Sequence, residues 1–434
     1  MEQQAVIDFF DNAAAGWDAQ LVRNEAVIGQ ILDNAGIRPG VSVLDVACGT
    51  GVLIPDYLKR GAAQITAIDI APEMVRIARE KFPQENVTVL CGDAAQTHFP
   101  APFDCIVIYN AFPHFPEPER LLAVTEEGKR YTLGDLNAAA ERIAGAVGEH
   151  RLVFVLCENT PGTLLGYLGC LKAGEVPLLL DAHIAPELLR GLLETYRPAF
   201  VHVPGDLPAE TGRVLEGFVP ALEVEDSVLL RRPGGQGPEL HPELALLLTT
   251  SGSTGSPKLV RLSGRNLDAN TRSIVEYLEL DEGQRPVTNL AMSYSYGMSI
   301  VNTHLLAGAA LVLTRRSVLE RPFWELVERE RVTSLAGVPY TYRMYRRAGL
   351  LEMELPALNT LTQAGGKLPE ALHLEFADWA ARTGRRFFVM YGQTEAAPRM
   401  GYLPAERAVE KCGSMGVPVP GGQFRLLGED GAPI

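Results

Sequence analysis

The N-terminal part of the chain alternates between short runs of β-branched and apolar residues and longer segments with helical periodicity. Uninterrupted apolar runs of this kind are typical of strands buried on both faces of a parallel sheet. Proline or glycine marks a helix end between them. The alternation therefore predicts a doubly wound α/β sheet. Strands are expected at residues 41–47, 64–69, 86–90 and 103–110, and helices at residues 27–36 and 72–82.

The pattern breaks after the fourth expected strand, where a proline-rich stretch and a turn-like Glu-Glu-Gly-Lys sequence precede a new helix. We expect a domain boundary near residue 123, which divides the chain into residues 1–122 and residues 124–434. The second part is again α/β in pattern. Its clearest strands are expected at residues 151–159, 175–182 and 199–204, with a buried helix at residues 161–174.

The last residues predict a strand at 423–427, a tight turn, and the first residues of a returning strand. A hairpin that stops at its turn leaves an unpaired edge, which native sheets avoid. We therefore expect the chain to be truncated at this end.

The charge balance excludes some classes of function. Lys and Arg total 39 and Asp and Glu total 53, a net charge of −14, whereas nucleic-acid surfaces and polybasic membrane patches need clustered positive charge. No apolar run is long enough to span a membrane, and the first residues do not resemble a secretory signal. The six cysteines form no Cys-x-x-Cys pair, which favours reduced, mostly buried thiols in a cytoplasmic protein.

A glycine-rich turn follows the first expected strand. Residues 48–51 read Cys-Gly-Thr-Gly, and such a turn leaves backbone amides free for a ligand. Asp69 ends the second strand, where a carboxylate can hold ribose hydroxyls, and Asp93 follows the third strand, where it can accept from an adenine amino group. The turn alone fits a tight connection equally well. The two acids in register favour an adenosine-containing cofactor.

Residues 9–122 resemble the class I S-adenosylmethionine-dependent methyltransferases. The resemblance implies binding of S-adenosylmethionine, with the methionine part near the glycine-rich turn, the ribose at the second strand, the adenine at the third and the methyl donor at the fourth. The family has a seven-stranded sheet, of which four strands are expected here, so we expect a truncated domain without robust methyl transfer. The residues implied are Asp45, Cys48, Gly49, Gly51, Asp69, Asp93 and Asn110.

A second loop is rich in serine, threonine and glycine. Residues 250–258 read Thr-Ser-Gly-Ser-Thr-Gly-Ser-Pro-Lys and lie between two expected strands. Hydroxyls and free amides at this density suit phosphate oxygens, and Lys258 supplies a cation. The loop is not a Walker loop, because no helix opens at its lysine. A flexible linker is the alternative, but the flanking strands disfavour it.

Two further polar clusters follow expected strands, at residues 364–368 and 391–395. Open α/β sheets bind ligands at these strand ends. Taken in order, the motifs of residues 124–434 resemble the adenylate-forming enzymes, which include acyl-CoA synthetases and peptide-synthetase adenylation domains. The resemblance implies ATP, Mg²⁺ and a carboxylic acid that attacks the α-phosphorus. The acyl group would then pass to coenzyme A or to the phosphopantetheine of an acyl carrier protein.

The resemblance also assigns individual residues. Thr254, Lys258 and Glu395 would be catalytic, with Glu395 as the Mg²⁺ ligand. The ATP or AMP site would comprise Thr250, Ser251, Gly252, Ser253, Thr254, Gly255, Lys258, Gly365, Gly366, Tyr391, Gly392, Gln393 and Thr394.

The acyl pocket is implied at Tyr294, Ser295, Tyr296 and Gly297. Amino-acid activators place an aspartate where Ser295 stands, and an unpaired ammonium is costly to bury, so a non-amino carboxylic acid is favoured. Tyr294 and Tyr296 fit core aromatics equally well.

The family continues with a ribose-binding aspartate and a mobile C-terminal domain that carries a catalytic lysine, and neither lies in this chain. A separate C-terminal domain is therefore a candidate partner. The leading interpretation is an acid-activating ligase behind half a methyltransferase. The alternatives are a methyltransferase with an adenylation remnant and a non-catalytic nucleotide-binding fusion.

Overall fold

The computed structural model describes residues 25–94, 97–108, 119–148, 150–250 and 259–428, together with parts of residues 7–23. The chain forms two compact units, Met1–Pro118 and Glu119–Ile434, which are described separately. Strand β5 (Leu121–Val124), at the junction expected from the sequence, pairs with strands of the second unit.

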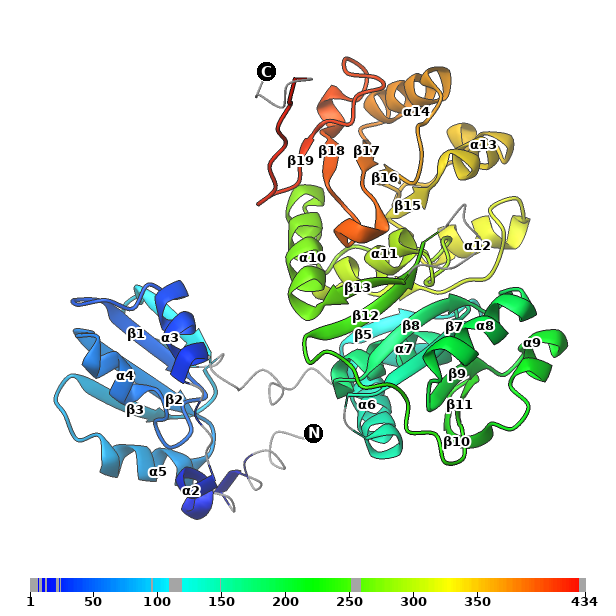
Figure 1. Ribbon diagram of the computed structural model, residues 1–434. Coiled ribbons are helices and arrows are strands. Elements are labelled where there is room, and N and C mark those ends of the chain that lie inside the picture. Colours follow the sequence, from blue (N-terminus) through cyan, green and yellow to red (C-terminus); the bar gives the residue numbers. More distant parts are fainter. Residues whose placement is uncertain are drawn as a thin grey trace. The chain divides into compact units, whose positions relative to one another are not determined.

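The first unit contains a parallel four-stranded sheet in the order β3-β2-β1-β4 (Figure 1). Three strands lie within the segments predicted from their apolar runs, and β3 extends one residue beyond its segment, to Cys91. The strands are β1 (Ser42–Val46), β2 (Gln64–Asp69), β3 (Val87–Cys91) and β4 (Cys105–Ile108). The helices are η1 (Ala14–Gly16), α2 (Trp17–Gln20), α3 (Glu25–Asn34), α4 (Ile54–Lys59) and α5 (Pro72–Lys81).

The two faces of this sheet are covered differently. Val43 and Ile65 on one face pack with α3, α4 and α5 in a buried apolar cluster. Leu44 on the other face packs against the loop residues Phe99 and Phe103. Because of this difference, burial alternates along the edge strand β4. Its residues at 105 and 107 are buried, whereas Ile106 is 60% exposed and Ile108 is 36% exposed.

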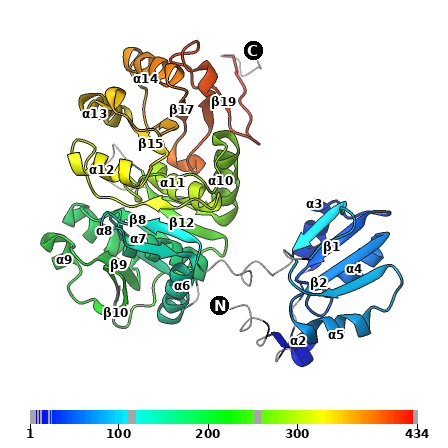
Figure 2. The same cartoon turned by 180° about the vertical axis from the view of Figure 1, so that it is seen from behind.

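The second unit is built on two larger sheets and a small one (Figures 1 and 2). The seven-stranded sheet has the order β10-β11-β9-β7-β8-β12-β13. Its strands are β7 (Leu152–Cys157), β8 (Val176–Asp181), β9 (Phe200–Pro204), β10 (Val219–Val224), β11 (Ser227–Arg231), β12 (Leu244–Thr249) and β13 (Leu259–Ser263). The helices around it are α6 (Leu133–Val147), α7 (Pro161–Ala173), α8 (Pro186–Tyr196) and α9 (Ala209–Val214).

The five-stranded sheet has the order β15-β16-β17-β18-β19, and the small sheet has the order β14-β5-β6. Their strands are β6 (Arg130–Thr132), β14 (Leu311–Val312), β15 (Ser334–Gly337), β16 (Thr360–Gln363), β17 (Arg386–Tyr391), β18 (Gly401–Leu403) and β19 (Val417–Pro418). The remaining helices are α10 (Gly264–Leu278), α11 (Ser295–Leu306), α12 (Arg321–Arg329), α13 (Pro339–Arg347), η3 (Leu350–Glu352), α14 (Glu370–Arg382), η4 (Thr394–Ala396) and η5 (Ala405–Arg407).

Helices cover both faces of the five-stranded sheet. Because side chains alternate along a strand, Phe387 of β17 packs with α12, α13 and α14, while Phe388 and Met390 pack with α10 and α11. Helices α10 and α11 also pack on β12 and β13 of the seven-stranded sheet. The predicted α/β fold class is thus confirmed, and these two helices join the two large sheets (Figure 1).

Local sequence explains where several helices begin. Thr132 caps α6 by accepting from the Asp135 amide, and the Thr132 amide donates to the Asp135 carboxylate. Ser263 and Asn266 form the same box at the start of α10. Helix α7 has Thr160 as its cap with proline next, and it ends at Gly174 in the left-handed conformation.

The predictions for the C-terminal hairpin, the cysteines and membrane spans can also be compared with the structure. The strand predicted at residues 423–427 does not form: residues 423–426 have no regular structure, and Leu427 makes a single β-bridge; Leu426 is 74% exposed. The rest of that predicted hairpin, residues 429–434, lies outside the described residues. All six cysteines are free thiols; four are buried, whereas Cys91 is exposed and Cys412 is half-buried. No helix in the described part of the chain has the length and apolar character that a membrane span requires.

Candidate active site

The polar clusters that follow β16 and β17 lie at one edge of the five-stranded sheet. Strands β15, β16 and β17 are parallel, so their carboxyl ends meet at the same edge. Gly365 and Gly366 follow β16 with φ angles of 75° and 154°, which a side chain rarely adopts. Tyr391 ends β17 and is 43% exposed, so its ring is available to a flat ligand.

Residues from three segments of the sequence converge at this edge. The hydroxyls of Ser295 and Thr394 lie 3.2 Å apart and join the start of α11 to η4. Tyr294 precedes α11 and is 39% exposed. A Cβ added to Gly365 would lie 2.4 Å from the Tyr294 hydroxyl, so this tyrosine reaches the glycine turn. The fold therefore groups two residues predicted for the nucleotide site with two predicted for the acyl pocket.

The serine- and threonine-rich loop closes a hairpin between β12 and β13, in which Thr249 pairs with Leu259. Thr250 is half-buried at the end of β12. The turn η4 contacts β13, the strand that follows the loop. The other predicted loop residues, Ser251, Gly252, Ser253, Thr254, Gly255 and Lys258, lie outside the described residues.

Glu395 lies in η4 and is exposed. Within the described ranges, no group of three or more His, Cys, Asp or Glu side chains could hold a metal ion. A lone carboxylate fits Mg²⁺ when nucleotide phosphates and water supply the remaining ligands, which is the usual arrangement for this ion. Glu395 is therefore a chemically suitable donor, and its role as a ligand stays a prediction.

Tyr296 lies deeper than Tyr294. It is 2% exposed, and its hydroxyl donates to Thr362 Oγ1 at 2.7 Å. Burial raises the pKa of Tyr296 to about 12, so the hydroxyl keeps its proton. The side chain lines a cavity whose wall includes Ser299 and Arg399. The sequence motifs did not point to Arg399.

Two predicted glycines are closed off by protein. A Cβ on Gly297 would lie 2.1 Å from the Ala291 carbonyl oxygen, and one on Gly392 would lie 1.8 Å from the Pro398 carbonyl oxygen. Gly297 is buried within α11. Both glycines permit close approach of two backbone segments, and a contact with ligand stays a prediction. Gln393 is exposed next to them.

The first unit brings its glycine-rich turn and its second-strand acid together. Asp69 is 9% exposed, and it accepts hydrogen bonds from the Gly49 amide at 2.8 Å and from the Ala71 amide at 2.9 Å. Gly51 has a φ of 85°, and a Cβ there would lie 2.5 Å from the Phe82 ring. The turn is thus held against the end of β2, as a nucleotide-type site requires.

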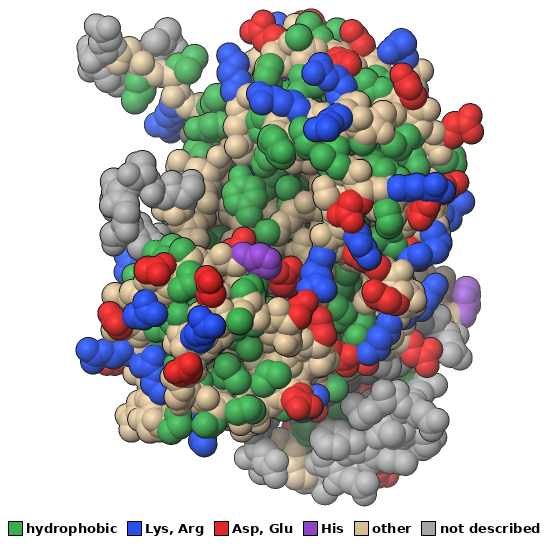
Figure 3. Space-filling view, turned by 90° about the vertical axis from the view of Figure 1, so that its right-hand side faces the viewer, with side chains coloured by type: hydrophobic (Ala, Val, Ile, Leu, Met, Phe, Trp, Pro, Cys, Tyr) green, Lys and Arg blue, Asp and Glu red, His purple; other side chains and the backbone are tan. Residues whose placement is uncertain are grey.

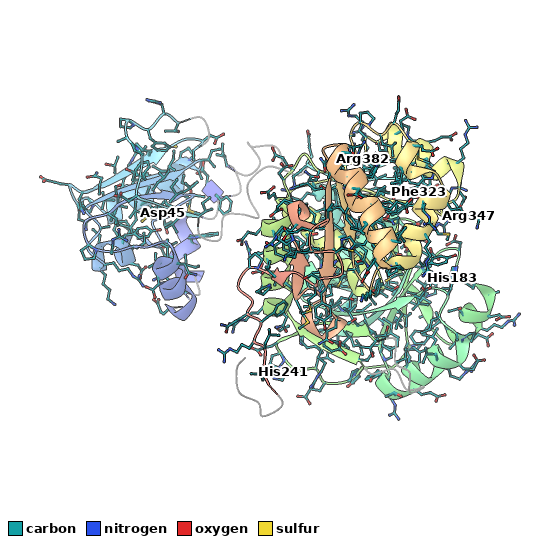
Figure 4. All side chains as sticks on the ribbon, turned by 90° about the horizontal axis from the view of Figure 1, so that it is seen from above. Asp45, His183, His241, Phe323, Arg347 and Arg382 are labelled. Carbon is teal, nitrogen blue, oxygen red and sulfur yellow. The ribbon has the colours of Figure 1, made fainter. Side chains whose placement is uncertain are left out.

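Asp45 lies inside the first unit (Figure 4) at 2% exposure. One of its carboxylate oxygens has no hydrogen-bond partner. Burial raises the pKa of Asp45 to about 8, against the effect of the nearby Tyr57 hydroxyl. The carboxyl therefore holds a proton at neutral pH unless a cation binds, and an orphaned oxygen of this kind fits the ammonium of a methionine group.

The remaining residues assigned to S-adenosylmethionine are less informative. Cys48 is buried, and burial raises the pKa of its thiol, so it is not a nucleophile. Asp93 follows β3 and is half-buried. Asn110 lies outside the described residues.

A wider groove of about 760 Å³ lies elsewhere on the second unit. Its charges are paired: Arg316 Nε lies 2.9 Å from Glu126, and Lys129 Nζ lies 2.6 Å from Glu225. None of the predicted site residues lines it. Figure 3 shows a hollowed face of the second unit on which acidic and basic side chains are interspersed. We therefore place the candidate site at the strand ends.

An α/β fold with glycine and hydroxyl clusters at parallel strand ends defines a nucleotide-binding class of enzyme. The sequence model of the family described as AMP-binding enzyme matches residues 114–434, most of the chain. The chain belongs to this family, and the resemblance to the adenylate-forming enzymes is confirmed. A second family model, described as methyltransferase domain, matches residues 43–130 and confirms the second resemblance.

The similar proteins include acyl-CoA ligases. A feruloyl-CoA synthase of Amycolatopsis sp is 29% identical over 328 residues, 72% of this chain and 64% of that protein. A 3-hydroxybenzoate–CoA ligase of Aromatoleum sp. (strain CIB) is 25% identical over 342 residues, 72% of this chain and 63% of that protein. The chain thus spans slightly less than two thirds of these relatives.

A solved structure shows the fold of the second unit. The o-succinylbenzoate CoA synthetase of Bacillus subtilis, in complex with its acyl-adenylate intermediate, has a TM-score of 0.58 and 22% identity. The match covers 74% of this chain and 65% of that one.

Proposed function

We propose that the second unit forms an acyl-adenylate from ATP and a carboxylic acid, and that a thiol then takes the acyl group. The observation that supports this most strongly is the convergence of Gly365, Tyr294, Ser295 and Thr394 at one sheet edge. The hydroxyl-rich loop joins two strands, and η4 contacts one of them. Family membership supports the same reaction.

The roles follow from the chemistry of these groups. The loop residues 250–258 bind the phosphates, and Thr254 and Lys258 donate to oxygens on which charge develops as pyrophosphate leaves. The exposed ring of Tyr391 and the neighbouring glycines bind the adenine. Glu395 holds the Mg²⁺, which when bound neutralises the charge of the leaving group.

The acid is a small molecule without an amino group beside its carboxylate, because Ser295 supplies no counter-charge for an ammonium. Relatives named as CoA synthases and ligases support coenzyme A as the thiol. A carrier-protein pantetheine and a separately supplied C-terminal domain belong to the same proposal as alternative partners. A cytoplasmic location also stays a prediction.

Pyrophosphate exchange with a panel of carboxylic acids tests the reaction. We expect acid-dependent exchange by the full chain, measured with and without the C-terminal domain of a relative. Glu395→Gln should lower the rate by about 10²–10³, the typical loss for a group that stabilises transition-state charge. Glu354→Gln, an exposed acid outside the site, is the matched control. Exchange that is absent with every acid, or equal in the two variants, contradicts the proposal.

For the first unit we propose binding of S-adenosylmethionine at the turn held by Asp69. The support is the pair of hydrogen bonds that fixes Gly49 and Ala71 on the Asp69 carboxylate. Calorimetric titration of the full chain should show binding that Asp69→Ala abolishes. Asp33→Ala, which removes an exposed partner of Arg60, should leave it unchanged. No heat with the wild-type chain removes this site.

A further inference from the structure

A buried arginine without an acidic partner lies in the wall of the cavity behind the candidate site. Arg399 is 4% exposed, and its guanidinium carbon lies 4.2 Å from the centre of the Tyr296 ring. Nη2 donates to the Ser299 hydroxyl at 3.2 Å, whereas Nε is buried without a hydrogen-bond partner. In the part of the chain that the structure describes, no carboxylate forms an ion pair with it.

Such an arrangement is costly, because charged side chains are almost never fully buried unless they are paired. The backbone of this segment has a separate anchor. The side-chain amide of Asn270 accepts from the Arg399 amide at 3.2 Å and donates to the Arg399 carbonyl oxygen at 2.7 Å. The guanidinium contacts the Tyr296 ring and the Ser299 hydroxyl, but no carboxylate among the described residues balances its charge.

Tyr296 is the residue that the cavity shares with the predicted acyl pocket. Tyr296 lines the cavity, and the adjoining Ser295 touches Thr394 at the sheet edge. The remaining wall is mostly aliphatic and comes from α10, α11 and β15 to β17. The cavity volume is about 20 Å³, enough for about one water molecule, so a carboxylate enters only when neighbouring side chains move.

His304 supplies a second unused polar atom in the same wall. It is 5% exposed, and its Nδ1 lies 2.9 Å from the Ile300 carbonyl oxygen. Since a carbonyl accepts, Nδ1 carries the hydrogen, and Nε2 is an unpaired acceptor. Burial lowers the pKa of His304 to about 4, so the ring stays neutral and adds no second positive charge to the cavity wall.

We infer that Arg399 binds a second anionic group of the substrate, and that the acid is a short dicarboxylic acid. A guanidinium binds a carboxylate through two parallel hydrogen bonds, and the unpaired Nε is one of the donors needed. The reacting carboxylate then lies at the sheet edge and the distal carboxylate lies in the cavity. The inference rests on the proposed function, whose substrate class it names.

Calorimetric titration of the full chain with matched acids tests it. Saturated diacids of three to five carbons are compared with monoacids of equal length. We expect the best diacid to bind about 10- to 100-fold more tightly than its monoacid, the range for a hydrogen bond to a charged group. Arg399→Met should abolish this preference. Arg382→Met, at an exposed arginine on α14 (Figure 4), should preserve it.

ATP is titrated in parallel, which separates the two proposals. Loss of ATP binding and of exchange contradicts the proposed function, whereas the ratio of diacid to monoacid affinity decides the inference by itself. A wild-type preference for the monoacid overturns the inference. So does a diacid preference that survives in Arg399→Met, and so does failure of every acid to bind.

Thermal unfolding shows whether the substitution acts through the fold. Since the guanidinium is desolvated and unpaired, Arg399→Met should unfold at the same temperature as the wild type or higher. If the unfolding midpoint of Arg399→Met lies more than about 5 °C below that of Arg382→Met, the guanidinium stabilises the fold, and the inference is overturned. Retained stability with lost diacid preference supports it.

Discussion

Replacing Gly392 with alanine is expected to displace the segment that carries Arg399. A Cβ at position 392 would lie 1.8 Å from the Pro398 carbonyl oxygen and 3.0 Å from the Arg399 Cα. Both neighbours are backbone atoms, so neither can rotate away as the end of a flexible side chain does. Asn270 also holds this segment by two hydrogen bonds, so relief of the contact requires the loss of other interactions.

The size of the effect follows from the closeness of the contact. Forcing extra atoms into a packed interior costs about 1–3 kcal/mol, and a contact with backbone belongs at the upper end. About 3 kcal/mol lowers the unfolding midpoint of a large unit by roughly 6 °C. The same displacement moves the guanidinium of Arg399, so binding of the acid should weaken as well.

Differential scanning calorimetry measures the first effect, and titration with the acid measures the second. Gly191→Ala is the matched control, because nothing lies within 4 Å of a Cβ at that exposed helix position. That control should gain about 0.5–1 kcal/mol in the free energy of unfolding. A Gly392→Ala chain that unfolds at or above the wild-type midpoint and binds the acid normally refutes the reasoning.

Three further predictions concern charge and exposure. Burial lowers the pKa values of His202 and His304 to about 4, whereas a histidine in the unfolded chain has a pKa of about 6.5. Between these two values the unfolded state binds more protons than the folded state. The free energy of unfolding therefore falls by up to about 3 kcal/mol per histidine as the pH drops from 6.5 to 4. Urea unfolding should show a shallower decline in His202→Gln or His304→Gln, and identical profiles would contradict this. The raised pKa of Asp45 has the opposite effect on stability. Its contribution to the free energy of unfolding is complete below about pH 4 and is lost as pH rises through 8. The stability difference between Asp45→Asn and the wild type should therefore grow with pH, and a constant difference would argue against this reasoning. Ile106 and Ile108 leave an apolar edge strand exposed, so Ile106→Lys with Ile108→Thr should reduce light scattering of the full chain at high concentration, and unchanged scattering would show that the edge is covered.

Strands could be predicted where the sequence pattern and the burial coincide. Residues 152–157 are apolar without interruption, and every one of them is buried in β7. The same reasoning located β1 to β4 and the glycine-rich turns at their ends. It failed at residues 423–426, which form no strand, and Leu427 makes only a single β-bridge.

The candidate site could be predicted only in part. Motif order assigned Tyr294 and Tyr296 to one pocket, but their different depths depend on how α11 packs on the five-stranded sheet. Arg399 stands alone among small and apolar residues, and a lone basic residue in such a run is a weak signal of burial. Whether it has an acidic partner depends on contacts with α10 and α11, more than 90 residues away in sequence. No local pattern contains that information.

The central claim is that residues 250–258 surround a triphosphate whose metal ion is bound by Glu395. A crystal structure of the full chain with Mg²⁺ and a non-hydrolysable ATP analogue tests it most directly. We predict phosphate oxygens against the loop, with a Glu395 carboxylate oxygen in the coordination sphere of the ion, directly or through one water molecule. Phosphates bound away from the loop, or a Glu395 carboxylate directed away from the ion, would contradict the account.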